Sequence, residues 1–237
     1  SYRNERYLYH RQCGLTGKQI ISSFSIDKPF PVYDVDAWWT DEWSPYDFGR
    51  NMDFHRPFFD QFFDVRDKVP RLARQQQRPM ENCDYCNCTG HSRNCYLCFS
   101  TNNSENCYHG TFLNYSVSCV DCTNVNHSEL CYECVNCTHC YHLHYSRDCK
   151  NCRDGLFLRE CIGCKDCFGC FNQIQKQYMI FNKQKTKEEY KMFMSSLNLG
   201  SFATMARYKE KFYEFSKCRI LKAYYGTNLE NFLGNYL

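Results

Sequence analysis

Residues 95–107 read Cys95-Tyr-Leu-Cys98-Phe-Ser-Thr101-Asn-Asn-Ser104-Glu-Asn-Cys107. Every third residue of this stretch is Cys, Ser or Thr, and the pattern continues on both sides. Of the 18 cysteines between Cys83 and Cys170, 17 are separated by multiples of three residues, and Cys88 is the exception. A period of three fits neither an α-helix nor a flat strand. It predicts a narrow β-solenoid in which every third side chain points inward.

The repeating unit is twelve residues long. The motif Ser-x-x-Cys begins at Ser92, Ser104, Ser116 and Ser128, and it resumes at Ser146 after an irregular piece at 137–143. Coils of this length would stack at about 4.8 Å through backbone hydrogen bonds. So small a coil encloses little volume, which explains why Ser, Cys and Thr are predicted inside and Tyr and Phe outside.

The rest of the chain has ordinary composition, so the fold is predicted to be composite. Thr186 followed by Glu189 is a capping-box signature that predicts a helix. We expect a mainly β protein: a narrow, cysteine-lined, right-handed β-solenoid flanked by a small α/β module and a C-terminal helical hairpin. The predicted parts are an aromatic-rich α/β module (1–80), the solenoid (81–173), the hairpin (174–220) and a candidate start of a second, degenerate repeat (221–237).

The N-terminal module is rich in aromatic residues. We predict a strand over 18–24, an extended piece over 30–33 and a helix after Pro57, whose apolar face includes Phe58, Phe59, Phe62 and Phe63. The aromatic side chains indicate either a small core packed against the repeat, which we favour, or a site for a ligand or peptide.

The cysteines also predict a metal centre. Three pairs of coils carry Cys-x-x-Cys, eight residues and a second Cys-x-x-Cys, so that stacking would arrange each foursome as a two-by-two square. Tetrahedral zinc needs thiolate sulfurs about 3.8 Å apart, and iron–sulfur clusters or copper(I) are the less favoured alternatives. The predicted metal ligands are Cys83, Cys86, Cys95, Cys98, Cys119, Cys122, Cys131, Cys134, Cys149, Cys152, Cys161 and Cys164.

Weaker metal candidates lie in the irregular piece. Cys137, Cys140, His139, His142 and His144 are residue types that hold metal in mixed sites. The alternative is that the histidines face solvent, and this is the interpretation that the period of three favours.

Two non-metal interpretations of the sulfurs stay open. Disulfides within or between coils would staple a solenoid too thin for a large hydrophobic core. Free buried thiols would act as small apolar side chains. Reduced, metal-binding cysteines would suit the cytoplasm and disulfides an extracellular setting, so the sequence leaves the compartment undecided.

Two resemblances follow from these motifs. The Ser-x-x-Cys coils resemble the twelve-residue β-helix of beetle antifreeze proteins in fold only, because the outward Thr-x-Thr ladder of ice binding is replaced here, for example by Ser100 and Asn102. The whole chain resembles uncharacterised, zinc-ribbon-associated cysteine-repeat proteins of candidate-phyla bacteria. That match rests on 3–6, 13–18, Trp38-Trp39, 48–50 and 161–181, and it implies architecture without an activity.

The parts of the chain differ in net charge. The solenoid carries 6 basic and 10 acidic side chains, whereas 174–237 carries 11 and 5. Nucleic acid is therefore not expected along the repeat, although the basic hairpin could bind it. Motifs for phosphate-cradling loops, serine nucleophiles and zinc proteases are missing, so we expect no enzyme. There is no apolar run long enough for a membrane span.

These observations predict a non-enzymatic, metal-binding scaffold or interaction protein, with zinc as the expected metal. The alternative is a disulfide-stapled or thiol-packed structural protein of a surface or filament assembly. The third hypothesis is a nucleic-acid- or ribosome-associated factor acting through the basic hairpin. The expected partner is another protein, or further copies joined through the solenoid ends.

Overall fold

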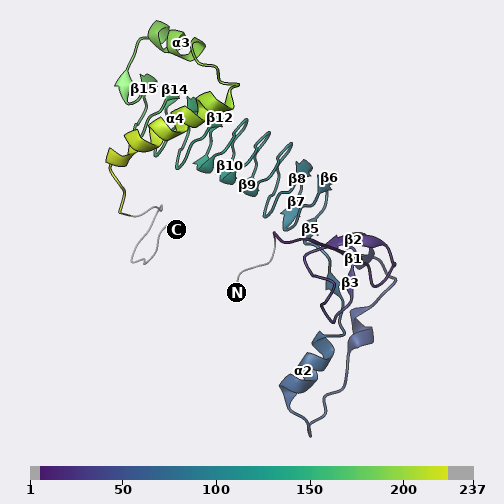
Figure 1. Ribbon diagram of the computed structural model, residues 1–237. Helices are drawn as coiled ribbons and strands as arrows, with labels where there is room; N and C mark the ends of the chain where they lie inside the picture. Colours follow the sequence, from purple (N-terminus) through teal and green to yellow (C-terminus); the bar gives the residue numbers. More distant parts are fainter. Residues whose placement is uncertain (1–5, 224–237) are drawn as a thin grey trace. The chain divides into compact units, whose positions relative to one another are not determined.

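The computed structural model describes residues 6–223 and shows a mainly β protein built around a cysteine-lined β-solenoid (Figure 1). The chain divides into two compact units, Ser1–Glu133 and Cys134–Leu237. This division falls inside the predicted repeat. The echo of the repeat at 228–232, predicted to start a second array, lies outside the described residues.

The first unit begins with the small α/β module. Strands β1 and β2 form an antiparallel hairpin in which Tyr9 pairs with Ser22, and β3 pairs in parallel with β4. The module comprises β1 (Tyr9–Gln12), β2 (Gln19–Ser22), β3 (Val32–Tyr33), α1 (Val35–Trp38), the 3₁₀ helix η1 (Pro45–Phe48), α2 (Phe58–Arg66) and β4 (Arg71–Leu72).

A compact core holds these strands together. It contains Cys13, Ile20, Val32, Tyr33, Ala37 and Ala73, with Phe24, Phe30, Trp38 and Trp43 packed against it. The Cys13 sulfur accepts backbone N–H bonds from Thr16 at 3.5 Å and Asp34 at 3.3 Å. This thiol therefore ties the turn after β1 to the start of α1.

Helix α2 does not join that core. It belongs to an excursion that leaves after β3 and returns at β4, and Figure 1 shows it away from β1, β2 and β3. Of its nine residues, all of them described, none is buried. The predicted aromatic core is therefore confirmed for Phe24, Phe30 and Trp38 but wrong for the phenylalanines of α2.

From β6 onward, paired residues in the coils of the first unit are twelve positions apart, whereas the first pair of strands, β5 and β7, has an offset of thirteen. Cys83 pairs with Cys95 and Thr111 with Thr123, all in parallel. Isolated bridges such as Tyr96 to Tyr108 keep the same offset between the longer strands. The strands are β5 (Gln76–Gln77), β6 (Glu81–Asp84), β7 (Thr89–Gly90), β8 (Arg93–Tyr96), β9 (Thr111–Asn114) and β10 (Thr123–Asn126).

A left-handed residue forms every corner of a coil. Each third residue from Asn82 to Phe181 has φ between +47° and +65°. Each triplet thus consists of a strand residue, a left-handed corner and an inward side chain. Asn, Asp, His and Gly hold 19 of these 34 corners and 7 of the 34 strand positions. The enrichment is expected, because these residues tolerate the left-handed region best.

In the second unit, paired residues are again twelve positions apart, although the sequence motif changes there. Val135 bridges to Arg147 and Thr138 to Lys150. The irregular piece at 137–143 is therefore a break in the sequence motif and not in the coil. The step from Ser128 to Ser146 is 18 residues, so the motif moves by half a coil while the backbone keeps its register.

Small and large inward residues compensate one another within a coil. A Cβ on Gly155 would lie 2.5 Å from a methyl group of Leu158, and one on Gly110 would lie 2.3 Å from Leu113. Glycine is needed at both places because the leucine three residues later fills the space. This is how a coil otherwise lined by Ser and Cys admits a leucine.

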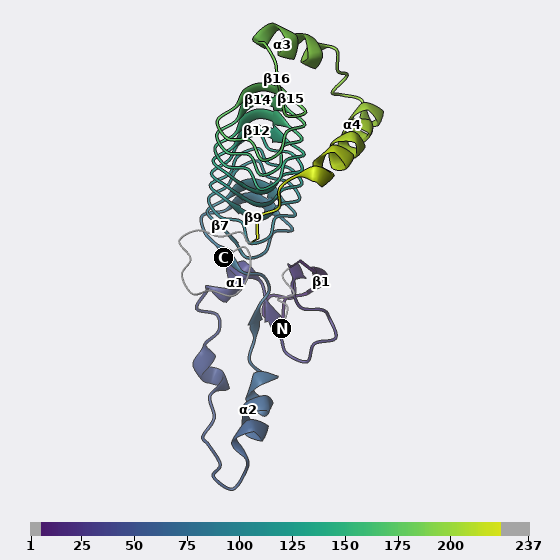
Figure 2. The same ribbon diagram turned by 90° about the vertical axis from the view of Figure 1, so that its left-hand side faces the viewer.

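A helical hairpin covers one face of the second unit's coils. Figure 1 and Figure 2 both show α4 alongside the coils that carry β12–β15. The elements are β11 (Val135–Thr138), β12 (Tyr141–His144), β13 (Arg153–Leu156), β14 (Lys165–Phe168), β15 (Gln177–Ile180), β16 (Lys183–Gln184), α3 (Lys187–Ser195), α4 (Phe202–Phe215) and the 3₁₀ helix η2 (Ser216–Cys218).

Both helices of the hairpin begin at a capped residue, and the first cap is the one that the sequence predicts. Thr186 and Glu189 form the capping box of α3, and the Ser201 side chain caps α4. The hairpin packs through an aromatic core that contains Phe157, Phe168, Tyr190, Met205 and Phe212. At the end of the coils, β16 pairs antiparallel with the edge strand β15.

The helices within residues 6–223 are too short and too polar to cross a bilayer.

Candidate functional site

The candidate site is the interior of the coils, where each thiol hydrogen-bonds to the backbone in a repeating way. Cys95 Sγ donates to the carbonyl oxygens of Arg93 at 3.4 Å and Ser104 at 3.7 Å. The same sulfur accepts the backbone N–H of Cys107, twelve residues later. Cys98, Cys140, Cys152 and Cys161 likewise accept the N–H of the residue twelve positions on.

This arrangement meets a requirement of the backbone. In each triplet the strand and corner N–H groups bond to neighbouring coils, as Tyr96 N–H does to Cys107 O and Leu97 N–H to Asp84 O. The N–H of the inward residue points into the coil, where an unpaired donor would be costly. Where the coil before it carries Cys or Ser at the matching position, that sulfur or oxygen accepts this N–H, as Ser146 Oγ does from Leu158 N–H at 3.1 Å.

Serine makes the same contacts as cysteine. Ser104 N–H donates to Ser92 Oγ at 3.3 Å, and Ser116 N–H donates to Ser104 Oγ at 3.2 Å. The interior therefore favours Cys, Ser and Thr for two reasons, their small size and their ability to accept a hydrogen bond. The sequence showed the first reason and did not show the second.

The first predicted foursome is brought together in the first unit. Cys83 and Cys95 stack in register, and thiol–thiol contacts join Cys83 to Cys95, Cys86 to Cys98 and Cys95 to Cys98. Cys83 lies at the edge of this group and is half-buried, while the other three are buried.

The third foursome forms a closed ring in the second unit. Side-chain contacts join Cys149 to Cys152, Cys152 to Cys164, Cys164 to Cys161 and Cys161 to Cys149. All four sulfurs are at most 2% exposed. Cys167 extends the group through a contact with Cys164.

The second foursome is divided between the two units. Cys119, Cys122 and Cys131 belong to the first unit, and Cys134 belongs to the second. Within the first unit, Cys119 contacts both Cys122 and Cys131 through side-chain hydrogen bonds.

The pKa values of the inward sulfurs shift in opposite directions. S–H donors from Cys152, Cys161 and Cys167 lower the pKa of Cys164. Contacts from Cys107 and Cys98 lower the pKa of Cys95 to about 3. At the edge of the first foursome, burial instead raises the pKa of Cys83 to about 11. The first and third foursomes therefore each contain at least one sulfur whose lowered pKa favours the thiolate form, which is the form that binds metal.

The weaker set of mixed ligands is not brought together as a whole, although the His142 and His144 ring centres lie 5.1 Å apart. Cys137 and Cys140 are buried in the coil interior, whereas His139 and His142 occupy left-handed corners and are exposed. His142 Nδ1 lies 3.1 Å from Asp154 Oδ1 on the surface. Within residues 6–223, no group of three or more His, Cys, Asp or Glu side chains is already arranged to hold a metal ion.

The basic hairpin uses several of its cations in packing. Lys209 lies 5.2 Å from the centre of the Tyr145 ring, and Lys211 lies 4.8 Å from that of Phe181. Lys217 pairs with Glu214 at 2.7 Å. These contacts give the lysines a structural role on the aromatic core.

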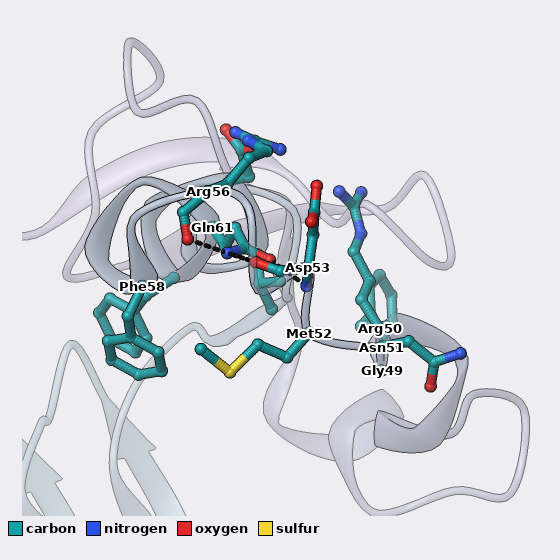
Figure 3. Close-up of a pocket in the computed structure, with 12 residues that line it drawn as sticks. Gly49, Arg50, Asn51, Met52, Asp53, Arg56, Phe58 and Gln61 are labelled. Carbon is teal, nitrogen blue, oxygen red and sulfur yellow. Dashed lines mark hydrogen bonds and ion pairs between the residues drawn. The ribbon is translucent and has the colours of Figure 1, made fainter.

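A pocket lies beside α2, among the aromatic residues for which the sequence indicated a ligand or peptide site as the less favoured alternative. It encloses about 360 Å³ between α2 and the segment 48–53. Phe58 and Met52 line one side, and Figure 3 shows the polar groups Arg50, Asp53, Arg56 and Gln61 around it. Gln61 fixes the loop, because its side chain bonds to both the N–H and the carbonyl of Asp53 at 2.9 Å.

No protein-family model matches the chain, and a search of curated proteins finds no match. The resemblances drawn from the sequence therefore stay predictions, and function has to be argued from the geometry.

Proposed function

We propose that the protein is a non-enzymatic structural scaffold whose coils are held together by backbone-bonded thiols. The observation that carries this proposal is the sulfur ladder, in which an inward thiol accepts the N–H from one coil further on and donates to carbonyl oxygens. In this role the cysteines replace the apolar core that so thin a solenoid has no room to build.

Zinc binding at the ring Cys149–Cys152–Cys164–Cys161 is a second candidate function. The closed ring of contacts supports it, as does the lowered pKa of Cys164. A bound zinc ion would replace S–H contacts with Zn–S bonds of about 2.3 Å, and the sulfurs would have to turn toward a common centre. The inward N–H groups would then stabilise the thiolates.

Paired substitutions test the scaffold directly. Cys107 is buried and lies outside all three foursomes. Cys107→Ser should keep the fold, because the hydroxyl accepts the N–H of Cys119. Cys107→Val should cost about 1–3 kcal/mol of unfolding free energy, because that N–H loses its acceptor. Equal stability of the two variants in urea unfolding would count against the proposal.

Native mass spectrometry separates the two candidates. Protein purified anaerobically with zinc present should show a bare mass with 20 free thiols if the ladder alone holds the coils. One zinc ion that is lost in the double variant Cys149→Ser, Cys161→Ser but kept in Cys107→Ser would establish the metal site. A mass short of two hydrogens per cysteine pair would show disulfides and overturn both candidates.

A further inference from the structure

The scaffold role does not account for the exposed aromatic face of α2. Phe58, Phe59, Phe62 and Phe63 of α2 are 56, 67, 49 and 45% exposed, and Phe54, in the turn before the helix, is 87% exposed. At about 150–250 Å² of surface per phenylalanine, these rings present roughly 600 Å² to solvent. Monomers seldom leave a continuous apolar patch of that size uncovered.

The charges of α2 do not share this face. Phe58, Phe59, Phe62 and Phe63 span about 140° of the helix circumference, and the acidic side chains of Asp60 and Asp64 lie opposite. Arg56 bonds to Asp64 at 3.0 Å on the polar side. The helix is therefore amphipathic in its own right, with an apolar side that the described residues do not bury.

The order of the phenylalanines points to the occupant. Residues 58–63 read Phe-Phe-Asp-Gln-Phe-Phe, so the aromatic positions are the same in both directions along the helix. In a twofold interface residue i of one copy meets residue j of the other and j meets i, so in an antiparallel pair this symmetric order brings phenylalanine onto phenylalanine at all four positions. In an antiparallel pair centred between Asp60 and Gln61, Phe58 faces Phe63 of the second copy, and Phe59 faces Phe62.

The pocket beside α2 fits the same pairing. Phe58 and Phe62 line it, so the Phe63 ring of the second copy, which meets Phe58, lies at its opening. Figure 3 shows Met52 next to Phe58 at this side of the pocket. The exposed surface of the rings, of Met52 and of the polar side chains around the pocket together approaches the roughly 800 Å² that each partner contributes to a standard interface.

We infer that the protein forms a homodimer through an antiparallel pair of α2 helices. The partner is a second copy of this chain, and the contact is made by aromatic side chains at the tip of the excursion between β3 and β4.

Sedimentation velocity of the full chain, reduced and at 1–100 µM, tests the inference. The natural chain should sediment as a concentration-dependent dimer. Phe59→Glu and Phe62→Lys should each weaken dimerisation at least tenfold. At a concentration low enough to keep the natural chain monomeric they should leave the circular dichroism and Tm nearly unchanged, because no residue of α2 is fully buried. Phe202→Glu, at an 88% exposed phenylalanine of α4, is the matched control and should stay dimeric.

Mixing the two variants tests the register. In the antiparallel pair, Glu at 59 would meet Lys at 62 of the other chain, and the second contact would restore a phenylalanine pair. An equimolar mixture should therefore recover the dimer. A monomeric natural chain, a dimer that survives Phe59→Glu, or a mixture that stays monomeric would each overturn the inference. The first result would indicate that another protein covers α2.

Discussion

Helices α2 and α4 are both amphipathic and rich in phenylalanine, but they have opposite environments. In α4, Met205 and Phe212 are 8% exposed, and the Phe212 ring lies 6.1 Å from that of Phe157. In α2, Phe59 is 67% exposed. The apolar face of α4 has a partner in the same unit, which is the outward aromatic side chains of the coils.

This contrast shows what a solenoid can and cannot bury. The interior admits small side chains, so any aromatic ring has to be covered from outside. In the second unit, Leu156, Phe157 and Phe168 face outward and α4 covers them. The same kind of helix without such a platform stays exposed, as α2 does, and its burial then depends on another chain.

The largest expected effect appears at alkaline pH, where the coils that α4 covers should lose stability. Burial raises the pKa of both the Cys149 thiol and the Tyr190 hydroxyl well above their ordinary values, and both groups lie in the second unit. A group with a raised pKa stabilises the fold below its unfolded pKa, near 8.5 for Cys and 10 for Tyr, and that stability is lost as the pH rises.

Each such group should cost about 1.4 kcal/mol per pH unit above its unfolded pKa. Sulfurs with a lowered pKa, such as Cys164, are already ionised there and add no slope. Urea unfolding in reducing buffer at pH 8, 9.5 and 11 should show a steadily falling midpoint. A constant midpoint would mean that the buried thiols do not keep their protons.

The next largest effect should come from Phe157→Ala. Phe157 is 1% exposed and stacks on Tyr145 at 5.0 Å as well as packing against Phe168 and Phe212. Removing its ring should cost about 3–5 kcal/mol of unfolding free energy, because it opens a cavity under α4. Thermal unfolding checks this, and a change below about 1 kcal/mol would show that α4 is not held by this core.

The smallest effect should come from the matching change on α2. Phe63→Ala removes a ring that is 45% exposed and lies under Arg66. At a concentration low enough to keep the chain monomeric, the unfolding free energy should change by no more than about 0.5 kcal/mol. A loss comparable to that of Phe157→Ala would mean that α2 is buried within the monomer after all.

Much of the fold could be predicted from the sequence. Three of its features are local regularities that need no knowledge of packing: the inward direction of every third side chain, the twelve-residue coil and the capping box at Thr186. The left-handed corners could also have been predicted, because Asn, Asp and His recur in the position before the inward residue. The shift of the Ser-x-x-Cys motif by half a coil reads as an irregular piece in the sequence. The reason is that a sequence motif can move to another side of the coil without any change in the backbone.

The candidate site was predictable in part. The spacing of Cys149, Cys152, Cys161 and Cys164 did predict four neighbouring sulfurs. It could not predict that the thiols bond to the backbone, because those partners lie one coil away. For the histidines at 139 and 142 the sequence favours exposure to solvent over a role as ligands, and their corner position does direct them away from the interior.

By itself, the sequence determined the solenoid, its sulfur-lined interior and the positions of the hairpin helices, because each follows from a short period or a local cap. The tertiary structure alone decided which aromatic faces are buried. The physical reason is that burial depends on what surface lies opposite a helix. The outward rings of the second unit supply that surface for α4, and the described part of the chain supplies none for α2.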